Sequence, residues 1–455
     1  MENTNRIQVA VQLRKRKMAF FGLSIGNFLV LLDTSILNVA LPHIQRDFNA
    51  AAELLPWTSV AYTIIFSGLL LASGAVADRV GGLRLYRISL VAFSIISLAC
   101  AASPSIQALI GFRALLGVAA ASVVPASIAV LAGLYPDSGE RARAIGSWAA
   151  ISSIGLLAGP VLGGFFADQG SWRMIFVVNI PVAVTALLFV RTLSNTRSKV
   201  ARPLDVPGII LSIILLTSMS YGFIDGGTNG LNRPTVLIAL GIAFSSAIIL
   251  VKVERMVAHP VLPPTIFAQA DLRFAVISAA VATLVFYGIL FTLAIWYQKA
   301  GGLSATETGL AFIPMTLPLC VLPFFTGRMV ARFGAERLIL FGLVCDVLAG
   351  LFLVGATGAS GSFIWVVLAE VALVLASTTV IPAATALVAI RAPAEYAGST
   401  QGALNAGRQA GAALGVAILG PLASLSTVGW VLSGISLFVT VVVIQGRASA
   451  HQELQ

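Results

Sequence analysis

The chain of 455 residues has few charged residues, few cysteines and few histidines, and each shortage excludes a class of protein. Only 10% of the residues are charged and 58% are hydrophobic, whereas a soluble domain carries about 25% charged residues. We therefore expect a membrane protein with many spans rather than a globular enzyme. The three cysteines lie in apolar segments and are expected to be packing residues. The three histidines lie in predicted loops without metal-ligand spacing, so no metal site is expected.

Two further absences concern the energy source and the partners. No lysine follows a glycine, so the sequence has no Walker A phosphate loop, and we expect neither an ATP site nor any other cofactor. Uphill transport would then depend on an ion gradient. The net charge is +10, but the basic residues lie in short loops between apolar segments, which argues against nucleic acid as a partner. The cluster "RKRK" at 14–17 indicates contact with membrane lipid headgroups.

Fourteen apolar segments are expected to be transmembrane helices, because roughly 20 apolar residues span a bilayer. Their approximate limits are 18–41, 56–77, 87–103, 106–134, 144–167, 174–190, 205–224, 234–252, 274–298, 308–327, 337–356, 362–388, 397–421 and 427–446. The even number places both termini on one side. Of the 28 Lys and Arg residues, 22 fall in loops on that side and four in loops on the other. The positive-inside rule therefore predicts that both termini are cytoplasmic.

An internal repeat divides the predicted helices into two halves. "GAVADRVGGLR" at 74–84 recurs as "GRMVARFGAER" at 327–337, an offset of 253 residues. "VVPASIAVL" at 123–131 recurs as "VIPAATALV" at 380–388. Repeats of equal topology predict halves related by an axis along the membrane normal. The predicted organisation is a basic N-terminus (1–17), a six-helix half (18–190), a linker with two inserted helices at 205–252 (191–273), a second six-helix half (274–446) and a cytoplasmic tail (447–455).

Several motifs carry a family resemblance over nearly the whole chain. They are "LDTSILNVALPHI" at 32–44, "GAVADRVGGLR" at 74–84, "RALLGVAAA" at 113–121, "GLLAGPVLGG" at 155–164 and "WRMIFVVNIP" at 172–181. With these motifs the sequence resembles the major facilitator superfamily, in its fourteen-span drug:proton antiporter branch, and is similar to the quaternary-ammonium and methyl viologen resistance exporters. The resemblance implies an all-α fold of two six-helix halves plus two central helices. It also implies a monomeric transporter in a bacterial cytoplasmic membrane.

The loop motif at 74–84 resembles the segment that, in this family, latches the two halves in the outward-facing state. The matching residues are Gly74, Asp78, Arg79, Gly81 and Arg84. The sequence departs from the family at Gly82 and Leu83, where basic residues are usual, so a weaker latch is expected. An ordinary positive-inside loop would explain the two arginines but not the aspartate.

The motif at 155–164 places Gly155, Gly159 and Gly163 on one helix face, where small residues let another helix come close. Pro160 removes a backbone donor and is expected to bend the helix. With Gly164, these residues resemble the antiporter motif of exporters. Plain small-residue packing is the alternative interpretation.

Buried charges are the strongest sign of function. Asp33 and Arg113 lie at similar depths in the outer half of the membrane, which predicts that they meet or share a cavity. Such a carboxylate can exchange a proton, and the resemblance ties the matching arginine to proton transfer. A structural ion pair is the alternative.

Glu370 lies level with Asp33 and is a second candidate for proton coupling or for attracting a cation. Asp346 and Arg408 are candidates of the same kind, but they could equally form a structural pair with each other. Asn38 and Tyr62 are expected to line the cavity next to Asp33, and an aromatic ring suits flat cationic or apolar substrates.

Together these features predict proton-coupled efflux of amphipathic or cationic compounds. The partners would be protons and a lipophilic, cationic or neutral small molecule. A carrier of one metabolite, importing or exporting it, is the alternative, because the same fold hosts both.

Overall fold

The computed structural model describes residues 2–193, 205–257, 269–356, 362–391, 397–422 and 424–452, and within these ranges the chain contains helices and no strands. The helices of the first half are α1 (Glu2–Asp47), the short 3-10 helix η1 (Ala52–Leu54), α2 (Leu55–Val80), α3 (Gly82–Ala101), α4 (Ile106–Leu134), α5 (Ser138–Asp168), α6 (Met174–Val177) and α7 (Asn179–Val190). The central pair is α8 (Val206–Asn229) and α9 (Pro234–Met256). The second half contains α11 (Ala270–Lys299), α12 (Ala305–Ala311), α13 (Ile313–Val321), α14 (Pro323–Phe333), α15 (Ala335–Gly355), α16 (Ser362–Arg391), α17 (Ala397–Leu419) and α18 (Leu425–Gln452).

All fourteen predicted segments overlap helices, but they do not all qualify as spans. Within the described ranges, eleven helices are long and apolar enough to cross a membrane, or twelve if one bent pair counts as a single span. That pair is α13 and α14, which meet at an angle of 72°. The segment at 174–190 is short and divided between α6 and α7, and α17 does not qualify although it is helical. The count of fourteen spans thus stays a prediction.

The two groups of helices pack in the same way internally. In the first group α1 packs on α5 and α7, and α3 packs on α4. In the second group α11 packs on α17 and α18, and α15 packs on α16. The turns that precede α3 and α15 also match, because Gly81 has φ +99° and Gly334, 253 residues later, has φ +85°. Both values favour glycine, so the internal repeat extends to the backbone.

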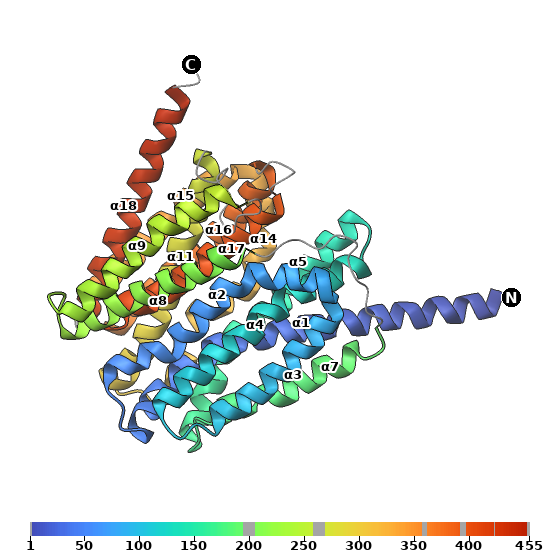
Figure 1. The fold of residues 1–455 in the computed structure, drawn as a ribbon, viewed down its shortest axis with the longest axis horizontal. Coiled ribbons are helices and arrows are strands. Elements are labelled where there is room, and N and C mark those ends of the chain that lie inside the picture. The colour runs from blue at the N-terminus through green and yellow to red at the C-terminus, as the bar shows by residue number, and fades with distance from the viewer. Residues whose placement is uncertain are drawn as a thin grey trace.

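The groups converge at one end and diverge at the other (Figure 1). Contacts between the groups join α2 to α17, α5 to α12 and α13, and α1 to α11. Several of these contacts involve the last turns of α1, α5 and α11, which end at Asp47, Asp168 and Lys299. We call this the outer end, following the side that the sequence predicts for these turns.

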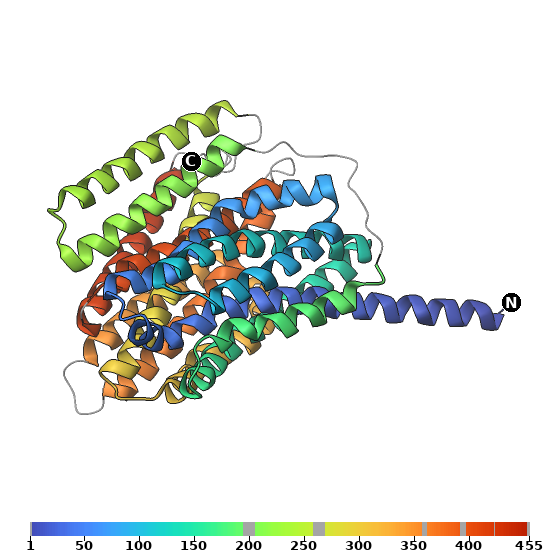
Figure 2. The same ribbon diagram turned by 60° about the horizontal axis from the view of Figure 1, so that its bottom comes forward.

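The central pair lies against the outside of the bundle, over α2 and α17 (Figure 2). Helix α8 contacts both groups, and α9 packs on α8. Asp225 near the end of α8 accepts hydrogen bonds from Asn229 (2.7 Å) and from Thr235 of α9 (3.3 Å). Its carboxylate therefore ties the two helices together at their outer turn.

Candidate functional site

Asp33 of α1 and Arg113 of α4 form a buried ion pair. Arg113 Nη1 lies 2.5 Å from Asp33 Oδ2, and the side chains are 1% and 0% exposed. The structure thus joins the two charges whose similar depths predicted an encounter. Neither charge has access to water here, and a buried pair of this kind is costly to break by removing one partner.

Three further groups complete this site. Arg113 Nε donates to the backbone oxygen of Thr58 (2.9 Å), and the guanidinium carbon lies 4.3 Å from the centre of the Tyr62 ring. Asn179 Nδ2 donates to Asp33 Oδ1 (3.0 Å) and also lies 3.2 Å from the hydroxyl of Ser97. The Tyr62 ring therefore packs on the guanidinium of the Asp33–Arg113 pair, and its part in lining a substrate cavity stays a prediction.

Asn179 was missed by the sequence reasoning, although there was a signal for it. It is an amide in the apolar segment "MIFVVNIPVAVTALLFV" at 174–190, and it is completely buried. Asn38, which was predicted to line the cavity, instead donates to the backbone oxygens of Thr34 (3.4 Å) and Ser35 (3.3 Å) of its own helix. The amide that reaches Asp33 thus comes from α7 and not from α1.

Glu370 of α16 is buried in the second half and is held differently. Its side chain is completely buried, and Tyr297 of α11 donates its hydroxyl to Glu370 Oε1 (3.0 Å). Its other oxygen has no hydrogen-bond partner among the described residues. In each half a buried carboxylate thus meets a partner on a neighbouring helix, which is an arginine in the first half and a tyrosine in the second.

Asp346 and Arg408 do not form the structural pair that the sequence left open. Both carboxylate oxygens of Asp346 are buried and lack a hydrogen-bond partner in the described ranges. Arg408 donates to Asn405 of its own helix (3.3 Å). The physical reason is the helix arrangement, because α15 packs on α16 and α18 whereas α17 packs on α11, α2 and α8.

The loop motif at 74–84 occupies the turn between α2 and α3. Gly81 takes the positive φ of +99° that ends α2 and starts α3, so this glycine has a steric role. Gly74 does not, since a Cβ there would meet no atom within 4 Å. Asp78 is half-buried, and Arg79 and Arg84 are in contact with other groups. The latch role of this loop stays a prediction.

The glycines of the motif at 155–164 allow α5 to pack closely on α1. A Cβ at Gly155 would lie 2.5 Å from the backbone oxygen of Phe28, and Cβ atoms at Gly159 and Gly163 would collide with Ser35 and Ile36. The second half repeats this packing, since Gly411 and Gly415 of α17 face the backbone oxygens of Ala280 and Leu284 of α11. The packing interpretation is therefore sufficient for these three positions.

Gly164 and Pro160 have a different neighbour, in the other half. A Cβ at Gly164 would collide with the backbone of Ala305, and a Cβ at Gly309 of α12 would collide with the backbone oxygen of Pro160. The same motif thus packs α5 against its own half with one face and against α12 with another.

This arrangement, with two groups of membrane-spanning helices and buried ionisable side chains inside each, is that of a membrane transporter. Residues 23–416 match the Major Facilitator Superfamily, and the chain belongs to this family. It is accordingly a transporter and not an enzyme.

The relatives include drug and antibiotic resistance proteins. The chain is 33% identical over 415 residues to the multidrug resistance protein Stp of Mycobacterium tuberculosis (strain CDC 1551 / Oshkosh), covering 90% of this chain and 76% of that protein. It is 29% identical over 418 residues to the methylenomycin A resistance protein of Bacillus subtilis (strain 168), covering 92% and 90%. These similarities agree with the drug:proton antiporter branch.

Solved structures share the fold at lower identity. A POT family transporter crystallised with a thioalcohol-conjugated peptide superimposes with a TM-score of 0.71 at 14% identity, covering 96% of both chains. This likeness concerns the fold alone.

Proposed function

We propose that this protein is a secondary transporter that exports amphipathic, cationic or neutral drug-like compounds in exchange for protons. The relatives are named for resistance to several drugs or to methylenomycin A, which supports efflux over uptake. We further propose that it acts as a monomer in the cytoplasmic membrane of a bacterium, surrounded by lipid. It would need no nucleotide or other cofactor.

The observation that carries the proposal is the environment of Asp33. Its carboxylate has Arg113 on one oxygen and Asn179 on the other. A proton or a cationic compound that reaches Asp33 must therefore compete with the guanidinium for the same negative charge. Arg113 retains the Thr58 oxygen and the Tyr62 ring when it releases Asp33, so the arginine is not left without contacts. Competition of proton and cargo for one carboxylate is the basis of antiport.

The contacts between the halves support an inward-facing state. The halves touch through α5 and α12 and through α1 and α11 at the outer end, and they diverge toward the ends of α1 and α18 that carry the termini (Figure 1). With the termini in the cytoplasm, as the distribution of basic residues predicts, the diverging side faces the cell interior. This is the side from which an exporter loads its cargo.

The test uses vesicles containing the purified protein, an imposed pH gradient and a pH-sensitive dye. Ethidium and a panel of lipophilic cations are added in turn to the natural chain, to Asp33→Asn and to the control Asp225→Asn, whose carboxylate lies in the central pair. We expect dye recovery with the natural chain and the control, and none with Asp33→Asn. Full transport by a folded Asp33→Asn protein would overturn the coupling role.

One observation favours a second candidate, a carrier of a single neutral metabolite. The Asp33–Arg113 pair has no net charge and is further bonded to the amide of Asn179, which resembles a site built for polar neutral groups. Such a carrier would give no dye response to any cation. It would respond instead to one member of a panel of neutral and zwitterionic metabolites.

A further inference from the structure

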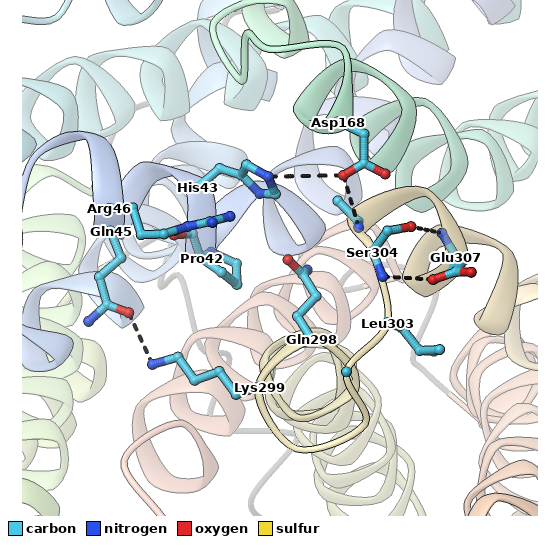
Figure 3. Close-up of a pocket in the computed structure, with 12 residues that line it drawn as sticks. Pro42, His43, Gln45, Arg46, Asp168, Gln298, Lys299, Leu303, Ser304 and Glu307 are labelled. Carbon is cyan, nitrogen blue, oxygen red and sulfur yellow. Dashed lines mark hydrogen bonds and ion pairs between the residues drawn. The ribbon is translucent and has the colours of Figure 1, made fainter.

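A pocket of about 590 Å³ lies at the outer end, between the two halves (Figure 3). One wall comes from the ends of α1 and α5 and the other from the end of α11 and the start of α12. The polar residues that line it include Gln45 and Asp168 from the first half and Gln298 and Lys299 from the second. The pocket therefore lies where the two halves meet.

The side chain of Asp168, the last residue of α5, contacts the opposite half. Its Oδ1 accepts a hydrogen bond from the backbone N–H of Ala305 (3.1 Å), and its Oδ2 accepts one from the N–H of Thr306 (2.7 Å). These are the first two residues of α12. The carboxylate therefore caps a helix of the opposite half, using both oxygens, at the end where a helix attracts negative charge.

Two more hydrogen bonds cross the interface beside this cap. Gln298 Nε2 donates to the backbone oxygen of Val39 (2.7 Å), and Lys299 Nζ donates to Gln45 Oε1 (3.0 Å). The Gln298 bond joins two neutral groups and the Lys299 bond joins an exposed ammonium to a neutral amide, whereas Asp168 offers both oxygens of a carboxylate to two N–H groups. Hydrogen bonds to charged groups are roughly twice as strong as neutral ones.

Next to this cap, α5 and α12 pack so closely that neither Gly164 nor Gly309 could carry a side chain without a collision. Gly164, four residues before Asp168, lies against the backbone of Ala305, and Gly309 of α12 lies against the backbone oxygen of Pro160. Close packing of α5 on α12 brings the two N–H groups within reach of the carboxylate. Any movement that separates the halves at this end must break both hydrogen bonds of Asp168.

We propose that Asp168 is the outer gate residue: its carboxylate caps α12 across the interface and holds the outer end closed, and losing the cap opens that end. The proposal rests on the proposed function only in naming the closed end the exit side. Asp168 touches no substrate in this scheme and is a positioning residue of the transport cycle.

The experiment measures the outer separation of the halves directly. In a chain whose three cysteines are replaced by alanine, spin labels are attached at Ala51 and Thr427, exposed positions at the outer end of each half. Pulsed EPR distances are recorded in nanodiscs for this chain and for Asp168→Asn. The matched control is Asp47→Asn, because Asp47 is also at the outer end but bonds Trp172 and Arg173 of its own half.

We expect Asp168→Asn to raise the population with the longer outer distance by about tenfold, because the variant loses one hydrogen bond to a charged group. Asp168→Glu should restore part of the closed population, and Asp47→Asn should leave the distribution unchanged. Equal distributions for Asp168→Asn and the parent chain would overturn the gate.

A second variant removes the donor instead of the acceptor. Ala305→Pro deletes one of the two N–H groups at the first position of α12, where proline fits a helix and where Ser304 already has the extended ψ of 167° that a following proline requires. It should shift the distances in the same direction as Asp168→Asn. Unchanged distances would contradict the gate role, even if Asp168→Asn failed to fold.

Because the EPR distances are measured without substrate, they are independent of the vesicle assay. A failure of Asp33-dependent antiport in the vesicles would not contradict the gate role of Asp168. Unchanged EPR distances would likewise not contradict antiport through Asp33.

Discussion

Removing the guanidinium of Arg113 alone should destabilise the protein more than removing both charges of the pair. Arg113→Ala leaves the carboxylate of Asp33, which is 0% exposed, with Asn179 as its partner. Breaking a buried pair from one side costs about 3–5 kcal/mol, because the remaining charge has no compensation. The single variant also loses the contacts with the Thr58 oxygen and the Tyr62 ring.

The double variant Asp33→Asn/Arg113→Ala has no unpaired charge, so its loss should be smaller than the sum of the two single losses by about 2 kcal/mol or more. The assay is a double-mutant cycle on thermal inactivation of the purified protein in detergent, read as half-lives at several temperatures because such unfolding is often irreversible. Additive effects of the two single variants would refute the reasoning. They would mean that the two charges contribute independently despite the 2.5 Å contact.

Two further stability predictions use contacts in each half. Gly159→Ala should cost about 1–3 kcal/mol, because its Cβ would collide with Ser35, whereas Gly146→Ala in the same helix, with no atom within 4 Å, should be neutral or slightly stabilising in the same inactivation assay. A larger loss at Gly146 than at Gly159 would contradict this packing. Tyr297→Phe removes the hydrogen bond to Glu370 and should cost about 1–3 kcal/mol, which a Tyr297→Phe/Glu370→Leu double variant should largely recover. Unchanged half-lives for Tyr297→Phe would refute the role of that hydrogen bond.

The encounter of Asp33 and Arg113 was predictable because depth follows from position along a helix at 1.5 Å per residue. Depth alone does not give the neighbour of a helix. Asp346 and Arg408 were therefore open to pairing by sequence, whereas their helices pack on different partners. The site at Asp33 also uses the backbone oxygen of Thr58, which no side-chain pattern can reveal.

The helix count shows a related limit. Each predicted segment became helical, since apolar runs and turn residues fix local structure. Whether a helix crosses the membrane depends on continuity, and here the bend of 72° between α13 and α14 and the break between α6 and α7 interrupt two expected spans. The cap from Asp168 to α12 joins residues 137 positions apart, and it depends on how the halves meet. Neither periodicity nor charge counting contains that information.

Asp346 offers a test that separates function from stability. A buried carboxyl group with neither oxygen hydrogen-bonded is destabilising in either protonation state, because its polar atoms have lost water without gaining a partner. Asp346→Leu keeps the branched shape of the side chain, with methyl groups in place of the two oxygens, and should stabilise the protein by about 1–3 kcal/mol. The control Asp225→Leu should destabilise it, because that carboxylate has two hydrogen bonds.

If Asp346 takes part in transport, the more stable Asp346→Leu protein should also transport less in the vesicle assay, since proteins keep unpartnered buried polar groups where function requires them. A stable variant with full transport would assign Asp346 no part in the cycle. A less stable variant would contradict the argument from the unpartnered oxygens.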